Sequence, residues 1–280
     1  MIRSVATVLF FAASSLGDKF ISAKLKCTAA EFSFLVALST AFFLALLLPF
    51  IGWEFSFSGG TALAVGGLTV LKLAEFYTGA VLLKQVSAYE LKAWLSLNVV
   101  FSFLVDLMLG EASYFAAFAL CSVVLAVGIV LIAMDEGKKR GVSVAALCLI
   151  YIASKFAYGF QMSALPAETS SLSALIAVML LVAAVQLPFV RFGKFFRKRG
   201  LAAGALTRIP NAAGLLTEAI AAGESLLLYA LVQPMQLALL FFTALVGREK
   251  MNACKIFGTV VTLAAVCAVT VLIYFYGRRI

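Results

Sequence analysis

Ionisable side chains lie inside several long apolar stretches of the sequence. The deepest of them are Lys19, Lys72, Glu75, Lys155 and Arg208, and Asp18, Asp106 and Glu218 lie nearer to the ends of such stretches. In the middle of a membrane helix, a charged group costs roughly 2.5 to 3.5 kcal/mol on insertion scales, so it usually faces the protein interior or an aqueous cavity. These side chains are therefore the first candidates for contact with a solute.

The composition is that of a membrane protein. The chain has 280 residues, of which 64% are hydrophobic and 12% charged, and its mean hydropathy is +1.10. Ordinary soluble domains are about 45 to 50% apolar and about 25% charged. One membrane span needs roughly 20 apolar residues, so the length accommodates about ten spans. This excess of apolar residues argues against a soluble enzyme.

The apolar stretches, separated by charged or Gly/Pro/Ser breaks, predict an all-α integral membrane fold with about ten transmembrane helices. The predicted ranges are 4–24, 30–51, 60–83, 88–109, 112–134, 142–164, 171–191, 201–222, 225–246 and 252–276.

Basic residues gather in the loops on one side of these predicted spans, thirteen against three. Cytoplasmic loops carry an excess of Lys and Arg, so the basic loops are predicted in the cytoplasm and both termini outside, in the plasma (inner) membrane. The net charge of +9 is then a result of topology, and we expect no nucleic-acid partner.

The sequence also repeats itself. Gly17-Asp18-Lys19-Phe20 returns as Ala153-Ser154-Lys155-Phe156 with an offset of 136, and Leu109-Gly110-Glu111 returns as Gly247-Arg248-Glu249 with an offset of 138. We predict a first five-helix repeat over 1–134, a basic connecting loop over 135–141 and a second repeat over 142–280. Because five is odd, the second repeat enters the membrane from the opposite side, as in many alternating-access carriers.

With these features, the chain resembles the drug/metabolite transporter superfamily, specifically its ten-helix EamA-type members. The resemblance rests on the Gly110-Glu111 turn, echoed at Arg248-Glu249, and on the small-polar kink at Gly17-Asp18 with Lys24 near the end of the first helix. It implies two inverted five-helix repeats and secondary transport. The chain departs from the family in its predicted external termini, and in Lys19 and Lys155, where many relatives have a neutral polar residue.

Lys19 and Lys155 are related by the repeat, so an inverted two-fold axis would bring both to a central cavity. A pair of cations there would suit an anionic substrate. Two other interpretations remain: each lysine pairs with a carboxylate such as Asp18 or Glu75, or extends its ammonium group to the membrane surface.

Lys72 and Glu75 are three residues apart and share a helix face, so they could form a local ion pair or contribute to binding. Glu75 and Asp18 are also candidates for proton coupling. Arg208 precedes Pro210, which should bend the helix and aim a bidentate donor at a carboxylate or phosphate group. Alternatively, Arg208 reaches the cytoplasmic surface.

Aromatic and amide residues in the same stretches could line a cavity and set its specificity, although packing is the commoner role of an aromatic side chain in a helical bundle. These candidates are Tyr77, Trp94, Asn98, Tyr158, Gln161, Asn211 and Gln233. Histidine is absent, and there is no phosphate-binding glycine loop. We therefore expect no catalytic residues, no cofactor and no metal site.

These observations favour a secondary transporter for a small anionic or zwitterionic metabolite, working by uniport, exchange (antiport) or proton coupling. One alternative is an exporter of cationic or amphipathic compounds, which would need a cavity dominated by carboxylates. Another is a scramblase or assembly factor without a soluble substrate. We expect a small-molecule substrate and membrane lipid as partners, and a monomer or homodimer.

Overall fold

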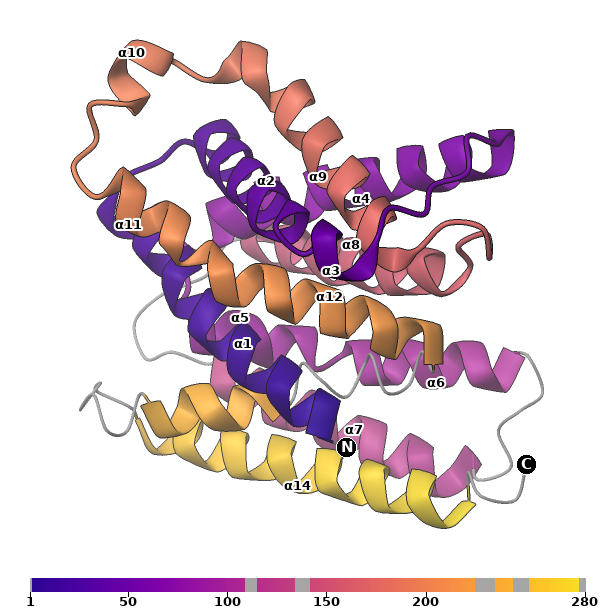
Figure 1. The fold of residues 1–280 in the computed structure, drawn as a ribbon. Helices are drawn as coiled ribbons and strands as arrows, with labels where there is room; N and C mark the ends of the chain where they lie inside the picture. The colour runs from indigo at the N-terminus through magenta and orange to yellow at the C-terminus, as the bar shows by residue number, and fades with distance from the viewer. Residues whose placement is uncertain (1, 109–114, 134–141, 225–234, 244–251, 277–280) are drawn as a thin grey trace.

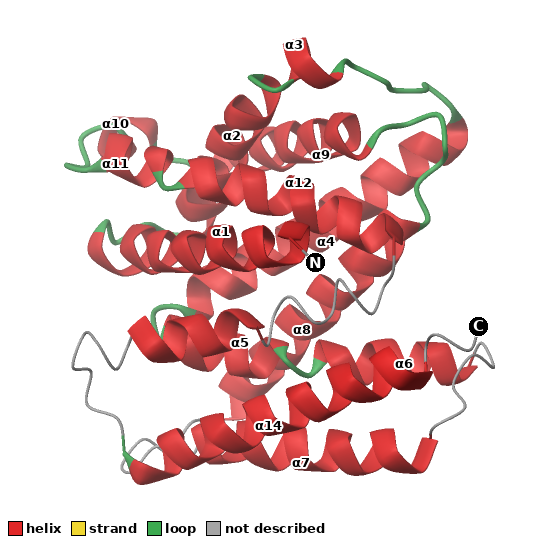
Figure 2. Cartoon of the chain, turned by 60° about the horizontal axis from the view of Figure 1, so that its bottom comes forward, coloured by secondary structure: helices red, strands yellow, loops and turns green. Residues whose placement is uncertain are grey.

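The computed structural model describes residues 2–108, 115–133, 142–224, 235–243 and 252–276, and these residues form helices joined by turns and loops, with no strand (Figures 1 and 2). Gln233, the Gly110-Glu111 turn and its echo at Arg248-Glu249 lie outside these ranges. The all-α prediction is confirmed for the described part of the chain.

The helices follow one another with short connections. Those before the predicted connecting loop are α1 (Ile2–Lys19), the π-helical turn η1 (Phe20–Lys24), α2 (Ala29–Ala45), α3 (Leu48–Ile51), α4 (Gly59–Leu82), α5 (Ala88–Leu95), α6 (Asn98–Met108) and α7 (Phe115–Ala133). Those after it are α8 (Val142–Ser163), α9 (Ser171–Gln186), the 3₁₀ turn η2 (Leu187–Phe189), α10 (Phe192–Phe195), α11 (Leu201–Leu206), α12 (Arg208–Glu224) and α14 (Ala253–Tyr276). Residues 235–243 are also helical.

Within the described ranges, four helical segments are long and apolar enough to cross a membrane: Ala29–Ile51, Gly59–Leu82, Ser143–Ser163 and Ser171–Phe189. Several of these segments begin where a side chain caps the first turn. Thr28 accepts from the backbone N–H of Glu31, whose carboxylate accepts from the N–H of Thr28, and Ser58 and Ser170 cap α4 and α9. Such caps satisfy donors that a helix start leaves unpaired.

Several helices predicted as continuous are interrupted, so those predictions are wrong in detail: 30–51 divides into α2 and α3, and two further breaks bear on the charged residues. The range 88–109 divides into α5 and α6 beside Ser96, whose hydroxyl donates to the carbonyl of Lys92, a bond that competes with helix geometry. The range 201–222 divides at Thr207, three residues before Pro210. Proline has no N–H to donate to the Leu206 carbonyl, which accounts for an interruption of the helix beside Arg208.

The helices pack most extensively in four pairs: α1 with α12, α2 with α9, α4 with α8, and α7 with α14. The first three pairs share one large buried core. The α7–α14 pair lies beside it along one edge of the molecule and has a smaller core, built around Phe118, Leu125 and Val269 (Figure 1).

Two glycines let α7 and α14 approach closely. A Cβ atom added at Gly128 would lie 2.9 Å from the carbonyl oxygen of Gly258, and one added at Gly258 would lie 2.7 Å from the carbonyl oxygen of Gly128. Both carbonyl oxygens belong to the backbone, which cannot rotate away as a flexible side chain can. Small residues at such a crossing are typical of helix packing in membranes.

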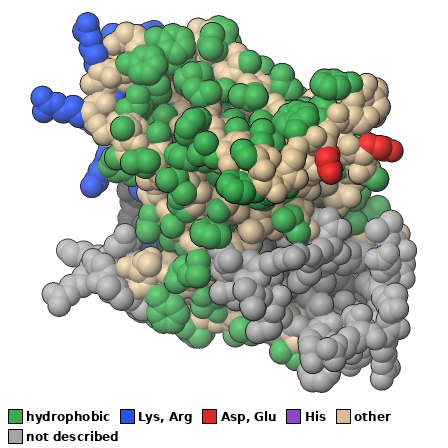
Figure 3. All heavy atoms as spheres, in the orientation of Figure 1, with side chains coloured by type: hydrophobic (Ala, Val, Ile, Leu, Met, Phe, Trp, Pro, Cys, Tyr) green, Lys and Arg blue, Asp and Glu red, His purple; other side chains and the backbone are tan. Residues whose placement is uncertain are grey.

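Charge is distributed unevenly over the surface. Lys and Arg side chains project from the end of the molecule where α10 lies, and acidic side chains project from the opposite end (Figure 3). The exposed basic residues include Lys26, Arg191 and Lys194, and the exposed acidic ones include Glu54 and Glu168. This distribution agrees with the one-sided basic loops expected from the sequence, as far as the described residues extend.

Replacing Gly128 with alanine should lower the thermal stability of the purified protein. Overpacking of this kind costs typically 1 to 3 kcal/mol, because the two backbones must separate. The melting temperature in detergent, followed by intrinsic fluorescence, measures the effect. Gly66→Ala is a matched control, since a Cβ atom there meets nothing within 4 Å. An equal melting temperature for the two variants would contradict the close approach.

Candidate functional site

A polar cavity of about 50 Å³ lies between α1, α2, α4, α5, α8 and α12. A water molecule needs at least about 10 to 15 Å³ measured in this way, so the space holds a few waters. Its charged lining residues are Asp18, Lys72, Glu75, Lys92, Lys155 and Arg208. The structure therefore brings four of the five deepest ionisable residues in the sequence to one place.

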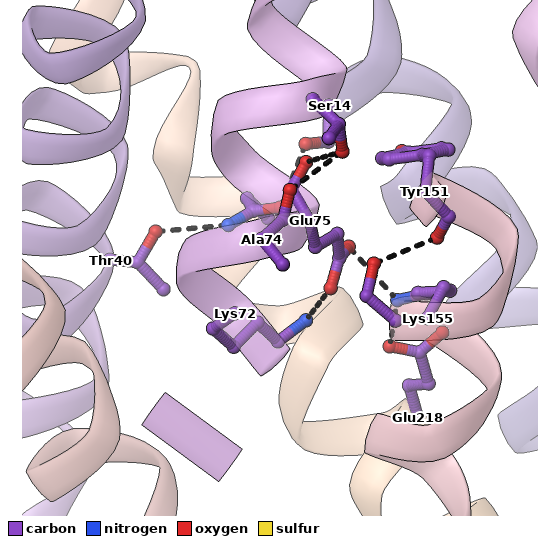
Figure 4. A network of polar contacts seen from close by, with 11 residues as sticks. Ser14, Thr40, Lys72, Ala74, Glu75, Tyr151, Lys155 and Glu218 are labelled. Atoms are coloured by element: carbon purple, nitrogen blue, oxygen red, sulfur yellow. Dashed lines mark hydrogen bonds and ion pairs between the residues drawn. The ribbon is translucent and has the colours of Figure 1, made fainter. Parts of the chain in front are cut away.

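The centre of the site is a row of alternating charges. Lys72 Nζ donates to Glu75 Oε2 at 2.7 Å, Lys155 Nζ lies 3.6 Å from Glu75 Oε1, and Lys155 Nζ donates to Glu218 Oε2 at 2.8 Å (Figure 4). The row joins α4, α8 and α12. Each of the four side chains is at most 9% exposed, so these ions exchange their hydration for one another.

Lys72 has an aromatic partner as well as its carboxylate. Its ammonium group lies 3.8 Å from the centroid of the Tyr158 ring, and Lys155 lies 5.3 Å from that of Phe11. Cation–π contacts of this kind gain strength where water is excluded. The predicted local pair of Lys72 and Glu75 is confirmed, and it extends to Lys155 on another helix.

Arg208 forms a second ion pair at the same cavity. Its Nη1 donates to Asp18 Oδ1 at 2.5 Å, and its Nη2 donates to Thr207 Oγ1 at 2.9 Å and to the Ser14 carbonyl at 3.3 Å. The side chain is fully buried. The alternative in which Arg208 reaches the surface is therefore wrong. The interruption at Thr207 places Arg208 as the first residue of α12, opposite the end of α1.

Lys19 lies elsewhere from its repeat partner. Its Nζ donates to the backbone carbonyls of Leu83 and Val86, at 2.5 and 2.8 Å, where α4 ends. Carbonyls at a helix end have no partner within the helix and attract a cation. Lys155 lines the cavity but Lys19 does not, so the structure does not bring the two ammonium groups together there.

The aromatic and amide candidates are scattered. Asn211 lines the cavity, donates to Thr40 Oγ1 at 2.9 Å and accepts from Ser14 Oγ at 2.9 Å. Tyr158 lies beneath Lys72, and its hydroxyl has no hydrogen-bond partner among the described residues. Gln161 donates to the Ala64 carbonyl at 3.1 Å, away from the cavity lining.

Trp94, Asn98 and Tyr77 also lie away from the cavity lining. Trp94 packs against both the large core and the α7–α14 core. Asn98 is fully buried, and its amide has no hydrogen-bond partner in the described part of the chain. Tyr77 is 53% exposed and lines an outer groove.

Sequence reasoning missed Lys92 as a member of the site. This residue lies only five positions from the start of α5, so it resembled a lysine at the end of a span. The short α5 instead brings it to the cavity, with its ammonium group 6.0 Å from the Phe11 ring centroid. The available signal was its position inside the predicted span over 88–109.

With Lys92 included, the cavity and its bonded partners hold four cations, Lys72, Lys92, Lys155 and Arg208, and three carboxylates, Asp18, Glu75 and Glu218. The site therefore carries both signs of charge, with an excess of one cation when all seven groups are ionised. No three His, Cys, Asp or Glu side chains within the described residues could hold a metal ion.

Comparison with known proteins supports the fold and nothing finer. No protein-family profile and no curated protein matches the sequence. A solved structure described only as "Crystal structure of protein" superposes with a TM-score of 0.63 over 96% of this chain and 99% of that chain, at 20% sequence identity. The architecture is thus similar to that of an existing structure over nearly its whole length.

Replacing Lys155 with methionine should strongly destabilise the protein, by about 3 to 5 kcal/mol, because Glu218 would remain buried without its cation. The melting temperature in detergent measures the loss. Lys84→Met serves as the control, since Lys84 is exposed. Adding Glu218→Leu to Lys155→Met should restore part of the stability. If Lys155→Met behaved like Lys84→Met, the buried row would not contribute as described.

Proposed function

We propose that this protein is a secondary transporter that carries a small anionic or zwitterionic metabolite across a membrane by alternating access. The observation that carries the proposal is the buried cavity of both charge signs, enclosed by helices that otherwise present apolar surfaces. Ionisable groups at such positions are costly and mark the path of a polar solute in many membrane proteins.

The pattern of helix packing supports an inverted repeat of ten spans. In that arrangement, α1, α2, α4 and α7 correspond to α8, α9, the α11–α12 pair and α14. Exchanging each helix with its counterpart turns the α1–α12 pair into the α8–α4 pair, and leaves the α2–α9 and α7–α14 pairs unchanged. The four most extensive pairings are thus consistent with one two-fold axis, as inverted repeats require.

Two ion pairs of the site join the proposed repeats: Asp18 of the first with Arg208 of the second, and Glu75 of the first with Lys155 of the second. Alternating access moves one repeat against the other around a fixed site. Such a movement would separate these pairs, and a solute that supplies the missing charges would offset the cost. The present cavity admits water only, so an organic solute requires this movement in order to bind.

The balance of charge favours an anion or a zwitterion over a cation. A carboxylate or phosphate group could replace Asp18 on Arg208, whose guanidinium offers two parallel donors. A zwitterion would in addition place its cation near Glu75. An exporter of cations would be expected to have more carboxylates than bases, the reverse of the four cations and three carboxylates here. Glu75 lies between two ammonium groups, so proton coupling through it would require one of them to move away.

The proposal includes the location of the chain. We place it in the plasma membrane, with the basic end in the cytoplasm, where positive loops are favoured.

A thermal-shift screen of the purified protein should identify the substrate class. A ligand that binds only the folded state stabilises it, by about 2.7 kcal/mol at one hundred times its dissociation constant. We expect anionic or zwitterionic metabolites to raise the melting temperature and cationic ones to leave it unchanged, and the stabilising compounds to exchange across proteoliposomes. Stabilisation by cations alone would refute the proposed class, and a failure to exchange any soluble solute would favour a scramblase or assembly factor.

Substitutions at the Asp18–Arg208 pair should shift substrate affinity in opposite directions. Arg208→Gln removes hydrogen bonds to a charged group, each worth about 1.5 to 3 kcal/mol, so binding should weaken at least ten-fold. Asp18→Asn removes the internal competitor for Arg208, so an anionic substrate should bind more tightly. Dissociation constants from ligand titration test both effects, and Glu168→Gln, an exposed carboxylate, is the control. A shift of both variants in the same direction would contradict the competition.

A further inference from the structure

A second and much larger hollow lies at the basic end of the molecule, outside the central cavity. This groove, of about 730 Å³, runs between the start of α2, the last turns of α4 and the end of α9, and we call it the basic groove. Ala29 and Gln186, at the ends of two apolar helices long enough to span a membrane, both line it. In a bilayer the groove would therefore lie at the level of the lipid headgroups.

Four cations line the basic groove, and one of them holds its walls together. Lys198 Nζ donates to Glu31 Oε2 at 2.6 Å and to the Lys26 carbonyl at 3.2 Å, which ties the segment after α9 to the turn before α2. Lys26, Arg191 and Lys194 are exposed, and none forms a salt bridge with a described residue. Three cations thus face the groove without a carboxylate of their own.

The backbone conformation at Lys26 is a second feature that indicates a binding site in the basic groove. Its φ angle is 49°, in the left-handed region, which costs an L-residue roughly 1 to 2 kcal/mol. The Lys198 contact to the Lys26 carbonyl holds this conformation. Such strain persists only where the surroundings fix it, and it is frequent where a ligand binds.

Aromatic side chains border the same groove. Phe189 lines it and is 68% exposed, and Phe192 stacks on Phe196 with ring centroids 5.9 Å apart, next to the basic residues. A small soluble anion has no apolar part that would contact these exposed rings. A phospholipid has one, because its acyl chains can lie against the rings while its phosphate meets the cations.

We propose that the basic groove binds the headgroup of an anionic membrane phospholipid, with the phosphate held by Lys26, Arg191 and Lys194 and the acyl chains beside Phe189. This inference rests on the membrane location included in the proposed function, but not on transport. Basic pockets at the cytoplasmic ends of spanning helices are suited to anionic headgroups, and each cation near the surface contributes about five-fold in affinity.

The test uses the purified full-length chain in neutral detergent, with phosphatidylglycerol, phosphatidylcholine and inorganic phosphate as separate probes. The apparent dissociation constant comes from the rise in melting temperature with probe concentration. We expect phosphatidylglycerol to stabilise the protein, and phosphatidylcholine and phosphate to do so far less. The double variant Arg191→Gln/Lys194→Gln should bind phosphatidylglycerol roughly thirty-fold more weakly, since two surface charges are lost.

The matched control is Arg197→Gln/Arg199→Gln, which removes two exposed charges from the same segment without touching the groove lining. It should bind phosphatidylglycerol as the parent does. Equal weakening in both double variants, equal binding of phosphatidylcholine, or full competition by inorganic phosphate would each overturn the lipid site. Exchange of a soluble solute in proteoliposomes is measured separately. If the protein exchanges a solute but does not prefer phosphatidylglycerol, only the lipid site is refuted. If it prefers phosphatidylglycerol but exchanges no solute, only the transport proposal is refuted.

Discussion

A charge buried among apolar helices must be paired, and the centre of this protein is organised by that requirement. Four ions on three different helices lose their hydration here: Lys72, Glu75, Lys155 and Glu218. Their mutual attraction offsets this desolvation cost only if the three helices keep a fixed rotation and depth. An apolar core of the same volume would be equally stable or more so. Stability alone therefore gives no reason for the row, whereas the proposed transport of a charged solute would give one.

Much of this could be predicted from sequence, because the signals are local. Apolar stretches predict where helices run, Pro210 predicts the interruption beside Arg208, and a spacing of three residues places Lys72 beside Glu75. The depth of a charge within an apolar stretch identified most of the charged residues that line the cavity.

Partnerships between helices could not be predicted in this way. Glu218 binds Lys155 from 63 positions away, and Lys19 caps the end of α4 instead of meeting Lys155. These outcomes depend on which helices become neighbours and on how each is rotated, and a flexible lysine can satisfy several arrangements at similar cost. Lys92 was missed for a related reason. The interruption at Ser96 shortens α5, so a lysine near the start of a predicted long span lies instead in a short helix that reaches the cavity.

Four ion pairs between the two proposed repeats share a polarity. They are Asp18 with Arg208, Glu75 with Lys155, Glu31 with Lys198 and Glu90 with Lys255, and in these four the acid belongs to the first repeat. If the repeats arose by duplication, their charges at these contacts have since become complementary. At these four contacts, two copies of the first repeat would place carboxylate against carboxylate, and two copies of the second would place base against base. If the chain is built of two such repeats, these contacts favour the pairing of one repeat with the other over the pairing of like with like.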